Sequence, residues 1–414
     1  MITRRDYLKL SVAAGAALAV APGLLLANSA RRGALITRAI PSSGERIPVV
    51  GLGSSASFAE AARGEDATAL REVFSAMVEH GGRVFDTAPG YGLSEEVAGR
   101  FAKELGLTER IFWATKLNVA PGPGASADPQ AARAQLQKSF ERIGKAPVDL
   151  VQVHNLADIP TQLPILKEAK EAGRLRYVGA TCTNTGQYPE LIDLLRRERL
   201  DFIGVDYAVD NRDVEATILP LAQERGTAVM VYLPFGRTRL WHRVRGREVP
   251  GWAAEFGAHS WAQFFLKFAL SHPAVTVVTP STSRAGNMID NMGAAYGELP
   301  DAGMRARMIA HVDALPAAEP PGPTHAVVLP AAVLERYVGA YRMESGMTLN
   351  VRRGGEGLIA GPAGQPEGPL STLSETRFAV PGGPTIEFQL DAAGNATGLT
   401  LGGAGKRMAG TRVP

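Results

Sequence analysis

The 414-residue sequence has a single cysteine, Cys182, and this scarcity excludes several kinds of site. An intrachain disulfide needs two cysteines, and a zinc site built on cysteines needs more than one, so both are excluded. The chain also has little excess of charge of either sign, because 44 basic and 41 acidic residues leave a net charge of +3. No dense stripe of Lys and Arg with interleaved aromatic residues occurs. We therefore expect no nucleic-acid partner.

Motifs for metals and for hydrolytic nucleophiles are missing too. Six of the seven histidines have no partner at metal-ligand spacing, namely His80, His242, His259, His272, His311 and His325. We expect no metal. The chain also lacks a G-x-S-x-G elbow and an S-x-x-K motif, which argues against a serine hydrolase.

The N-terminus has the pattern of an export signal. Residues 3–9 read TRRDYLK, an uncharged Ala-rich run covers residues 10–27, and small residues stand at Ala27 and Ala30. The segment resembles a bacterial twin-arginine (Tat) signal peptide over residues 1–30. The alternative is a transmembrane anchor, but the run is marginal in length and diluted by Ala and Gly. We expect cleavage, a periplasmic or otherwise exported protein, and no stable membrane span afterwards.

Downstream, apolar runs alternate with amphipathic stretches of helical period, which predicts eight strand–helix repeats. The expected strands are 48–53, 83–88, 111–116, 149–154, 177–182, 201–207, 228–235 and 275–280. The expected helices are 67–79, 94–105, 128–143, 162–172, 187–198, 215–225, 260–271 and 285–297. Eight such repeats predict an α/β fold, a (β/α)8 TIM barrel over residues 35–317. A doubly wound sheet is the alternative, but Gly51 and Gly53 match its G-x-G-x-x-G motif poorly.

The composition changes after the barrel. Residues 318–326 are rich in Pro and Gly and predict a linker. Residues 327–414 begin with a short helical stretch and continue as alternating segments divided by Gly, Asn and Asp, which predicts a small antiparallel all-β domain. This domain resembles modules found behind secreted serine hydrolases. It carries no clustered acid, base or nucleophile, so we interpret it as a structural module or a docking site for a protein partner.

Four ionisable residues stand at the ends of three successive predicted strands: Asp86, Tyr91, Lys116 and His154. A parallel barrel places its active site at the carboxyl ends of its strands. There a tyrosine can protonate a carbonyl oxygen when a lysine eases release of its proton and an aspartate holds that lysine. A histidine can orient the carbonyl by a hydrogen bond. Each residue alone could be a turn, surface or core residue, but their joint position favours catalysis.

The blocks FDTAPGYG, ATK and VHN occur in the order and spacing of the aldo-keto reductase superfamily, which this chain resembles over residues 35–315. The resemblance continues through GRLRYVGAT, DFIGVDYAVDNRD, VYLPFGR, SWAQFFLKFALSHP and TPSTSRAGNMIDN. It implies NADPH binding without a Rossmann fold and hydride transfer to an aldehyde or ketone, a small-molecule carbonyl substrate. In that scheme Tyr91 is the general acid, Lys116 and Asp86 tune it, and His154 orients the carbonyl.

The resemblance also implies a set of cofactor-binding positions. They are Thr181 and Cys182 at the carboxamide, Tyr207 stacked on the nicotinamide, Leu233, Phe235 and Arg237 at the pyrophosphate, Pro280, Ser281, Thr282 and Arg284 at the 2′-phosphate, and Asn291 at the adenine. Three positions depart from the family pattern: Cys182, Gly204, where Gln is common, and Asn287, where Arg is frequent. Arg284 favours NADP, and NAD remains an alternative.

The substrate pocket is less well marked in the sequence. Five aromatic residues could wall it or simply pack in the core: Phe58, Trp113, Tyr232, Trp241 and Trp252. The Arg-rich segment 236–257 could be a lid or a solvated face. A second function also stays open, a non-catalytic exported barrel that binds a cofactor or another ligand, because Cys182 and Gly204 depart from the carboxamide contacts.

Overall fold

The computed structural model describes residues 33–64, 67–122, 124–316, 329–344, 346–355, 357–363, 367–380, 384–391, 393–403 and 406–413. The expected signal peptide and linker, residues 1–30 and 318–326, lie outside these ranges. Among the described helices, none combines the length and the apolar character needed to cross a membrane. Across the same residues, no group of three or more His, Cys, Asp or Glu side chains is placed to hold a metal ion.

Eight parallel strands form one sheet whose order follows the chain. They are β3 (Leu52–Gly53), β4 (Val84–Asp86), β5 (Phe112–Leu117), β6 (Val148–Val153), β7 (Leu175–Cys182), β8 (Phe202–Asp206), β9 (Ala228–Tyr232) and β10 (Val275–Val278). Parallel bridges join Val50 to Val278 and Gly53 to Ser281, so the last strand returns to the first. The predicted (β/α)8 barrel is confirmed.

The closure of this barrel explains the two glycines that fitted a dinucleotide-binding motif so poorly. A Cβ atom on Gly53 would stand 2.5 Å from the carbonyl oxygen of Thr279, and one on Gly51 would stand 2.6 Å from that of Val84. These contacts are far shorter than van der Waals distance. Glycine is therefore needed where the first strand passes between its neighbours.

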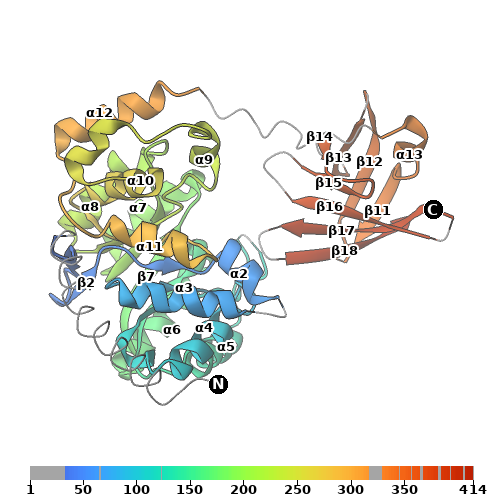
Figure 1. The fold of residues 1–414 in the computed structure, drawn as a ribbon. Coiled ribbons are helices and arrows are strands. Elements are labelled where there is room, and N and C mark those ends of the chain that lie inside the picture. The colour runs from blue at the N-terminus through green and yellow to red at the C-terminus, as the bar shows by residue number, and fades with distance from the viewer. Residues whose placement is uncertain are drawn as a thin grey trace, which may run out of the picture.

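Helices cover the outside of the barrel in the predicted alternation (Figure 1). The eight expected helices are α3 (Thr68–Glu79), α4 (Ser94–Glu104), α5 (Pro129–Ile143), α6 (Ile159–Glu171), α7 (Tyr188–Arg197), α8 (Ile218–Glu224), α10 (Trp261–Leu270) and α11 (Ala285–Gly293). Three more were not predicted: α2 (Ser57–Ala62), α9 (Arg239–Arg243) and α12 (Ala302–Asp313). Short 3-10 turns are η1 (Thr108–Arg110), η2 (His154–Leu156), η3 (Thr185–Gln187), η4 (Asp213–Glu215) and η5 (Gly251–Phe256).

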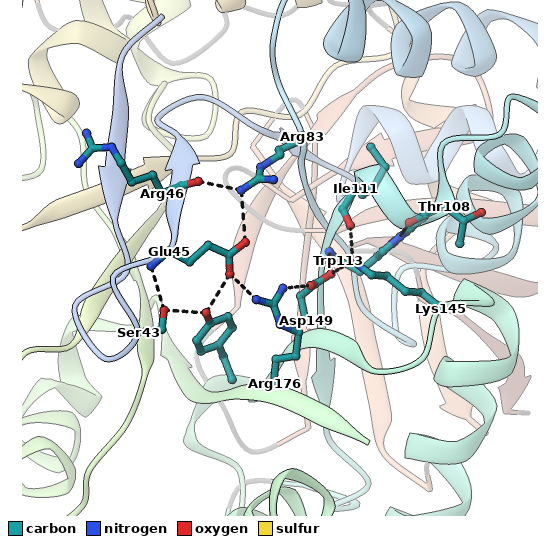
Figure 2. Close-up of polar contacts among 11 residues, drawn as sticks. Ser43, Glu45, Arg46, Arg83, Thr108, Ile111, Trp113, Lys145, Asp149 and Arg176 are labelled. Atoms are coloured by element: carbon teal, nitrogen blue, oxygen red, sulfur yellow. Dashed lines mark hydrogen bonds and ion pairs between the residues drawn. The ribbon is translucent and has the colours of Figure 1, made fainter. Parts of the chain in front are cut away.

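A hairpin of β1 (Thr37–Ala39) and β2 (Arg46–Pro48) covers the amino-terminal end of the barrel. Its Ile40 and Ile47 join the cluster of apolar side chains inside the barrel. Glu45 accepts hydrogen bonds from Arg83 and from Arg176, and Arg176 also donates to the buried Asp149 (Figure 2). Polar contacts thus tie the hairpin to the strand ends opposite the predicted catalytic residues.

The second domain is a closed antiparallel barrel in which each strand pairs with the next and β11 pairs with β18. Its strands are β11 (Gly339–Met343), β12 (Thr348–Gly354), β13 (Gly357–Pro362), β14 (Gly368–Thr372), β15 (Arg377–Ala379), β16 (Thr385–Leu390), β17 (Ala396–Gly403) and β18 (Lys406–Val413), preceded by the short helix α13 (Ala331–Glu335). Tyr337 and Tyr341 are fully buried, and the Tyr337 ring stacks on Phe388 at 4.6 Å. The predicted all-β domain is confirmed, and both tyrosines belong to its core.

Candidate active site

Asp86 and Lys116 form a buried ion pair at the carboxyl ends of neighbouring strands. Asp86 ends β4, Lys116 lies in β5, and the Lys116 Nζ atom stands 2.8 Å from both carboxylate oxygens. The ammonium also donates to the carbonyl oxygen of Thr87 at 2.9 Å. Burial lowers the pKa of Lys116, but the Asp86 carboxylate and the Tyr91 phenol raise it by more. Lys116 therefore remains an ammonium ion at neutral pH.

Tyr91 lies on the loop between β4 and α4, above this ion pair. A turn places it there, since its backbone N–H donates to the carbonyl oxygen of Ala88 at 3.0 Å and Gly92 takes a positive φ of 62°. The Lys116 Nζ atom lies 5.0 Å from the centre of the Tyr91 ring. Burial raises the pKa of Tyr91, and Lys116 opposes that rise without overcoming it. The phenol therefore keeps its proton at neutral pH, with a cation beside it to stabilise the phenolate once the proton leaves.

His154 follows β6 directly and faces Tyr91. The two ring centres are 5.9 Å apart, and the rings meet edge to face at 82°. Burial, and then the nearby charge of Lys116, lowers the pKa of His154 to about 3. The imidazole is therefore neutral and can donate one N–H to a substrate oxygen. The structure brings all four predicted catalytic side chains together.

Two further polar side chains reach this cluster, and sequence reasoning gave neither of them a catalytic connection. Tyr232, the last residue of β9, donates a hydrogen bond to Asp86 Oδ1 at 3.1 Å. Gln152 in β6 donates through Nε2 to the Tyr232 hydroxyl at 2.8 Å. A signal for Gln152 existed, because it stands two residues before His154 and so lies on the same face of its strand. Tyr232 resembled any other aromatic residue near a strand end.

Unusual backbone conformations gather on the loops that follow the barrel strands. Asn155, Leu156 and Asp158 after β6, and Leu233 and Arg237 after β9, all take positive φ. Such conformations cost about 1–3 kcal/mol each and persist only where the surrounding structure holds them. In the first group, the Asn155 N–H donates to the Thr181 hydroxyl at 2.9 Å. These loops are therefore shaped at the expense of stability, as loops of functional sites often are.

The three positions expected to meet a nicotinamide carboxamide offer fewer contacts than the family pattern suggests. Thr181 is 1% exposed and its hydroxyl oxygen already accepts from Asn155, which leaves the hydroxyl proton and one lone pair for a ligand. Cys182 is fully buried and its thiol donates to the carbonyl oxygen of Asn184 at 3.3 Å. Gly204 has no side chain, and the Tyr232 ring fills the space beside it.

Tyr207 does not lie with the other predicted site residues. It is fully buried, and its ring packs against Phe268 on α10 and against His272, two residues past the end of that helix. Its hydroxyl donates to Glu215 and accepts from Arg305. The ring therefore occupies the helix layer, and the expected stacking on a nicotinamide has no support from this position. Tyr232 is the tyrosine that reaches the catalytic cluster.

The remaining cofactor positions fall on two adjacent loops, because β9 and β10 are paired. After β9, Leu233 and Arg237 shape the backbone, and Phe235 packs on Trp241 with ring centres 4.9 Å apart. After β10 come Pro280, Ser281, Thr282 and Arg284, and Asn291 follows on α11. The Thr282 hydroxyl accepts from the backbone N–H of Arg284 at 3.1 Å. The exposed Arg284 is the N-cap of α11, so its side chain starts at the end of the helix where the first N–H groups lie.

The aromatic residues considered as pocket walls have different surroundings. Phe58 and Trp113 are fully buried and pack against Phe85 at 5.5 and 5.4 Å, so both are core residues. Trp252 is partly buried beside Phe264. Trp241 is 38% exposed on α9, within the Arg-rich segment, and its ring also packs against Phe235 and Phe265.

Several known proteins resemble this chain. The aldo-keto reductase str7 of Strobilurus tenacellus is 29% identical over 40% of this chain and 50% of its own length. The NADH-specific methylglyoxal reductase of Escherichia coli (strain K12) is 28% identical over 41% and 57%, and the aldo-keto reductase YhdN of Bacillus subtilis (strain 168) is 28% identical over 47% and 60%. The matched region thus spans about half to three fifths of these curated relatives.

Solved structures share the barrel. The holo form of aldo-keto reductase AKR11C1 from Bacillus halodurans has a TM-score of 0.55 and 23% identity, covering 67% of this chain and 96% of its own. A Klebsiella pneumoniae aldo-keto reductase in complex with NADPH has a TM-score of 0.54 and 20% identity over 67% and 96%. At these identities the likeness concerns the fold. Membership rests on the sequence match to the Aldo/keto reductase family, which runs through residues 49–307 and so through most of the chain: this protein belongs to that family.

Proposed function

We propose that the barrel is an NADP(H)-dependent oxidoreductase that reduces an aldehyde or ketone, or oxidises the corresponding alcohol, with Tyr91 as general acid. One observation carries this proposal. A buried lysine, fixed by Asp86 at 2.8 Å, stands beneath a protonated tyrosine whose ring meets a neutral histidine. That arrangement suits delivery of a proton to a carbonyl oxygen.

The side chains and backbone along β10 and α11 fit a phosphorylated nucleotide. Arg284 is exposed and can form a bidentate pair with a phosphate, and the first turn of α11 has N–H groups that favour an anion. Thr282 and Ser281 would line the same phosphate, and Leu233 to Arg237 would line the pyrophosphate. Thr181 would hold the carboxamide with its hydroxyl proton. When bound, the dihydronicotinamide supplies a hydride. Arg284 favours NADP, with NAD as the alternative.

The residues of this chain then handle the proton. His154 donates an N–H to the carbonyl oxygen and fixes its position beside the Tyr91 hydroxyl. Tyr91 passes its proton to that oxygen, and the Lys116 ammonium stabilises the resulting phenolate. Asp86 keeps the ammonium in place. For alcohol oxidation the phenolate accepts the proton instead, and the same cation favours that form.

The Tyr91→Phe variant tests the assignment, with Tyr177→Phe as its matched control. Tyr177 lies at the opposite end of the barrel, where its hydroxyl donates to Glu45 at 2.8 Å. We expect Tyr91→Phe to lower carbonyl reduction about 10²–10⁴-fold, the usual contribution of a general acid, while NADPH fluorescence titration shows unchanged binding. Tyr177→Phe should keep the wild-type rate of carbonyl reduction and the wild-type NADPH binding. Reduction that survives in Tyr91→Phe would refute the role of Tyr91.

A non-catalytic binding barrel is the second candidate, favoured by the thin set of carboxamide contacts at Cys182 and Gly204. The two candidates differ in the wild-type protein. Tight NADPH binding with turnover of at least one member of an aldehyde and ketone panel supports the reductase. Binding without turnover across the panel supports the second candidate, and failure to bind NADPH or NADH rejects an oxidoreductase.

We also propose that the protein is exported by the twin-arginine route after folding, with its cofactor already bound. The support is the sequence of residues 1–30, with Arg4 and Arg5 before the apolar run. Replacing both arginines by lysine keeps the charge and should hold the protein in the cytoplasm of a bacterial host, as cell fractionation would show. Unchanged export would refute the route. Purified exported protein should carry nucleotide, which absorbance after denaturation would detect.

For the C-terminal β barrel we propose a structural role or a role in binding a protein partner. Its buried tyrosines are occupied within the domain, since Tyr341 donates to the Tyr337 carbonyl oxygen at 2.8 Å and Tyr337 donates to the Glu375 carbonyl oxygen at 2.7 Å. A chain that ends at residue 316 should therefore keep carbonyl reduction. Loss of turnover in that soluble, folded fragment would assign the domain a part in catalysis.

A further inference from the structure

Tyr232 lies where a second phenol can act on the catalytic ion pair. Its hydroxyl is held between two buried groups, Asp86 Oδ1 at 3.1 Å and Gln152 Nε2 at 2.8 Å. Its ring centre lies 5.0 Å from Lys116 Nζ, the same distance as the ring of Tyr91. Lys116 Nζ therefore lies close to two tyrosine rings, and only the ring of Tyr91 belongs to the general acid assigned above.

Gly204 in β8 makes this position of Tyr232 possible. A Cβ atom at residue 204 would stand 2.2 Å from Tyr232 Cε2, 2.8 Å from Cζ and 2.9 Å from the hydroxyl oxygen. Even the smallest side chain would therefore displace the phenol. A glutamine, the residue common at this position of the family, could not coexist with it. The glycine and the tyrosine form one size-complementary pair across the β8–β9 ladder, where Gly204 pairs with Met230.

The direction of the hydrogen bonds in this chain is fixed by chemistry. The Gln152 NH2 group can only donate, so the Tyr232 oxygen accepts from it. A carboxylate can only accept, so the Tyr232 proton goes to Asp86. The opposite amide orientation would take that proton away and leave Asp86 Oδ1 facing an oxygen with no hydrogen between them. Burial raises the pKa of Tyr232 well above its ordinary value, which keeps that proton in place.

We propose that Tyr232, admitted by Gly204, is a positioning residue of the proposed reductase that shares the Asp86 carboxylate with Lys116. Its hydrogen bond holds Oδ1 in place and spreads the negative charge of the carboxylate. Asp86 then compensates less of the positive charge of Lys116. That charge lowers the pKa of Tyr91 more, so Tyr91 is a stronger acid than it would be without the Tyr232 hydroxyl. The inference rests on the proposed function for its effect on turnover, whereas its effect on the acidity of Tyr91 does not depend on turnover.

The sign of the effect follows from the charges around Tyr91. Asp86 raises the pKa of Tyr91 and Lys116 lowers it. Without the Tyr232 hydroxyl, the carboxylate keeps its full charge and draws Lys116 more strongly, so the pKa of Tyr91 rises further. A weaker acid donates its proton more slowly. The substrate and cofactor contacts assigned above do not include the Tyr232 hydroxyl, so KM should change little.

The experiment is a double-mutant cycle with Tyr232→Phe and Gly204→Ala, read by the pH dependence of kcat. We expect Tyr232→Phe to lower kcat about tenfold and to move the alkaline limb upward by about 0.5–1 pH unit, with KM within about threefold of the wild type. Gly204→Ala should reproduce both changes, because its Cβ displaces the same phenol. The double variant should be no worse than either single variant, since both remove one interaction. An unmoved alkaline limb in Tyr232→Phe, or fold-changes that multiply in the double variant, would overturn the proposal.

A measurement without turnover separates this inference from the proposed function. Protein labelled with ¹³Cζ-tyrosine reports the titration of each phenol by NMR, and Tyr91→Phe assigns the Tyr91 signal. In Tyr232→Phe the Tyr91 signal should titrate at higher pH than in the wild type, and in Tyr177→Phe it should not move. If the wild-type protein reduces no carbonyl yet this shift appears, the reductase proposal fails and the positioning role stands. If turnover is present and the shift is absent, the positioning role fails alone.

Discussion

The Lys116→Met variant measures how much the buried ion pair contributes to stability. The two side chains are 1% and 4% exposed, and the ammonium contacts both carboxylate oxygens. Removing one partner of a buried pair costs about 3–5 kcal/mol, because the other charge remains buried without compensation. Tyr232 still donates to Asp86 Oδ1, so we expect the lower end of that range, about 3 kcal/mol near neutral pH.

The loss should depend on pH in a defined direction. Burial raises the pKa of Asp86 even beside Lys116, and removing the cation raises it further. A carboxyl with a raised folded-state pKa takes up its proton in the folded protein while the unfolded chain is still ionised. The free energy of unfolding therefore increases as the pH falls toward the unfolded pKa of about 3.9, by at most about 1.4 kcal/mol per pH unit.

Urea unfolding at a series of pH values provides the assay, and the Lys116→Met/Asp86→Asn double variant provides the control. Asparagine keeps the shape of aspartate but carries no charge, so the double variant should recover most of the stability. The difference between single and double variants should shrink as the pH is lowered. A Lys116→Met variant as stable as the wild type at neutral pH, or a difference that is constant with pH, would refute the reasoning.

Three further predictions concern other parts of the molecule. His154 should stay neutral down to about pH 4, because burial lowers its pKa to about 3, and NMR titration of its ring signals should show no change between pH 8 and about pH 5. Gly53→Ala should lose about 1–3 kcal/mol in urea unfolding because its Cβ meets the Thr279 carbonyl oxygen at 2.5 Å, whereas Gly122→Ala, with open space around it, should change little. Phe388→Ala should lower the stability of the C-terminal barrel by about 3–5 kcal/mol and leave the kinetics of carbonyl reduction unchanged.

Much of the fold could be predicted because the strands of a barrel are buried on both faces. Runs such as 228–235 are almost entirely apolar, and the helices between the strands repeat an amphipathic period, so each repeat is visible in the sequence. Helix α12 is not. Its N-cap is Asp301, whose side chain accepts from the Met304 N–H at 2.8 Å, a cap that is clear only once the helix is seen. The role of Gly51 and Gly53 depends on strands far away in sequence, which no local pattern reports.

The residues of the candidate site could likewise be predicted only in part. Asp86, Tyr91, Lys116 and His154 could be predicted because each stands at a strand end, and the topology of a barrel brings such ends together. Tyr207 also stands at a strand end, yet its ring turns outward to Phe268, since the direction of a side chain at the last residue depends on the packing behind it. Tyr232 and Gly204 acquire meaning only from each other and from Asp86. Their contact depends on the radius of the closed barrel. That radius is set by all eight strands together, so no local sequence pattern predicts the contact.

The closure of both sheets has a consequence for how the chain can be made. A strand at a sheet edge exposes unpaired N–H and C=O groups that can recruit other chains into aggregates. Here Val50 pairs with Val278 in the first barrel, and β11 pairs with β18 in the second. In each sheet the first and last strands therefore pair with each other. Pairing of strands so distant in sequence is slow to form. A growing chain therefore carries two open edges until the last strand of each barrel emerges, and loss of β18 alone would expose β11 and β17 together.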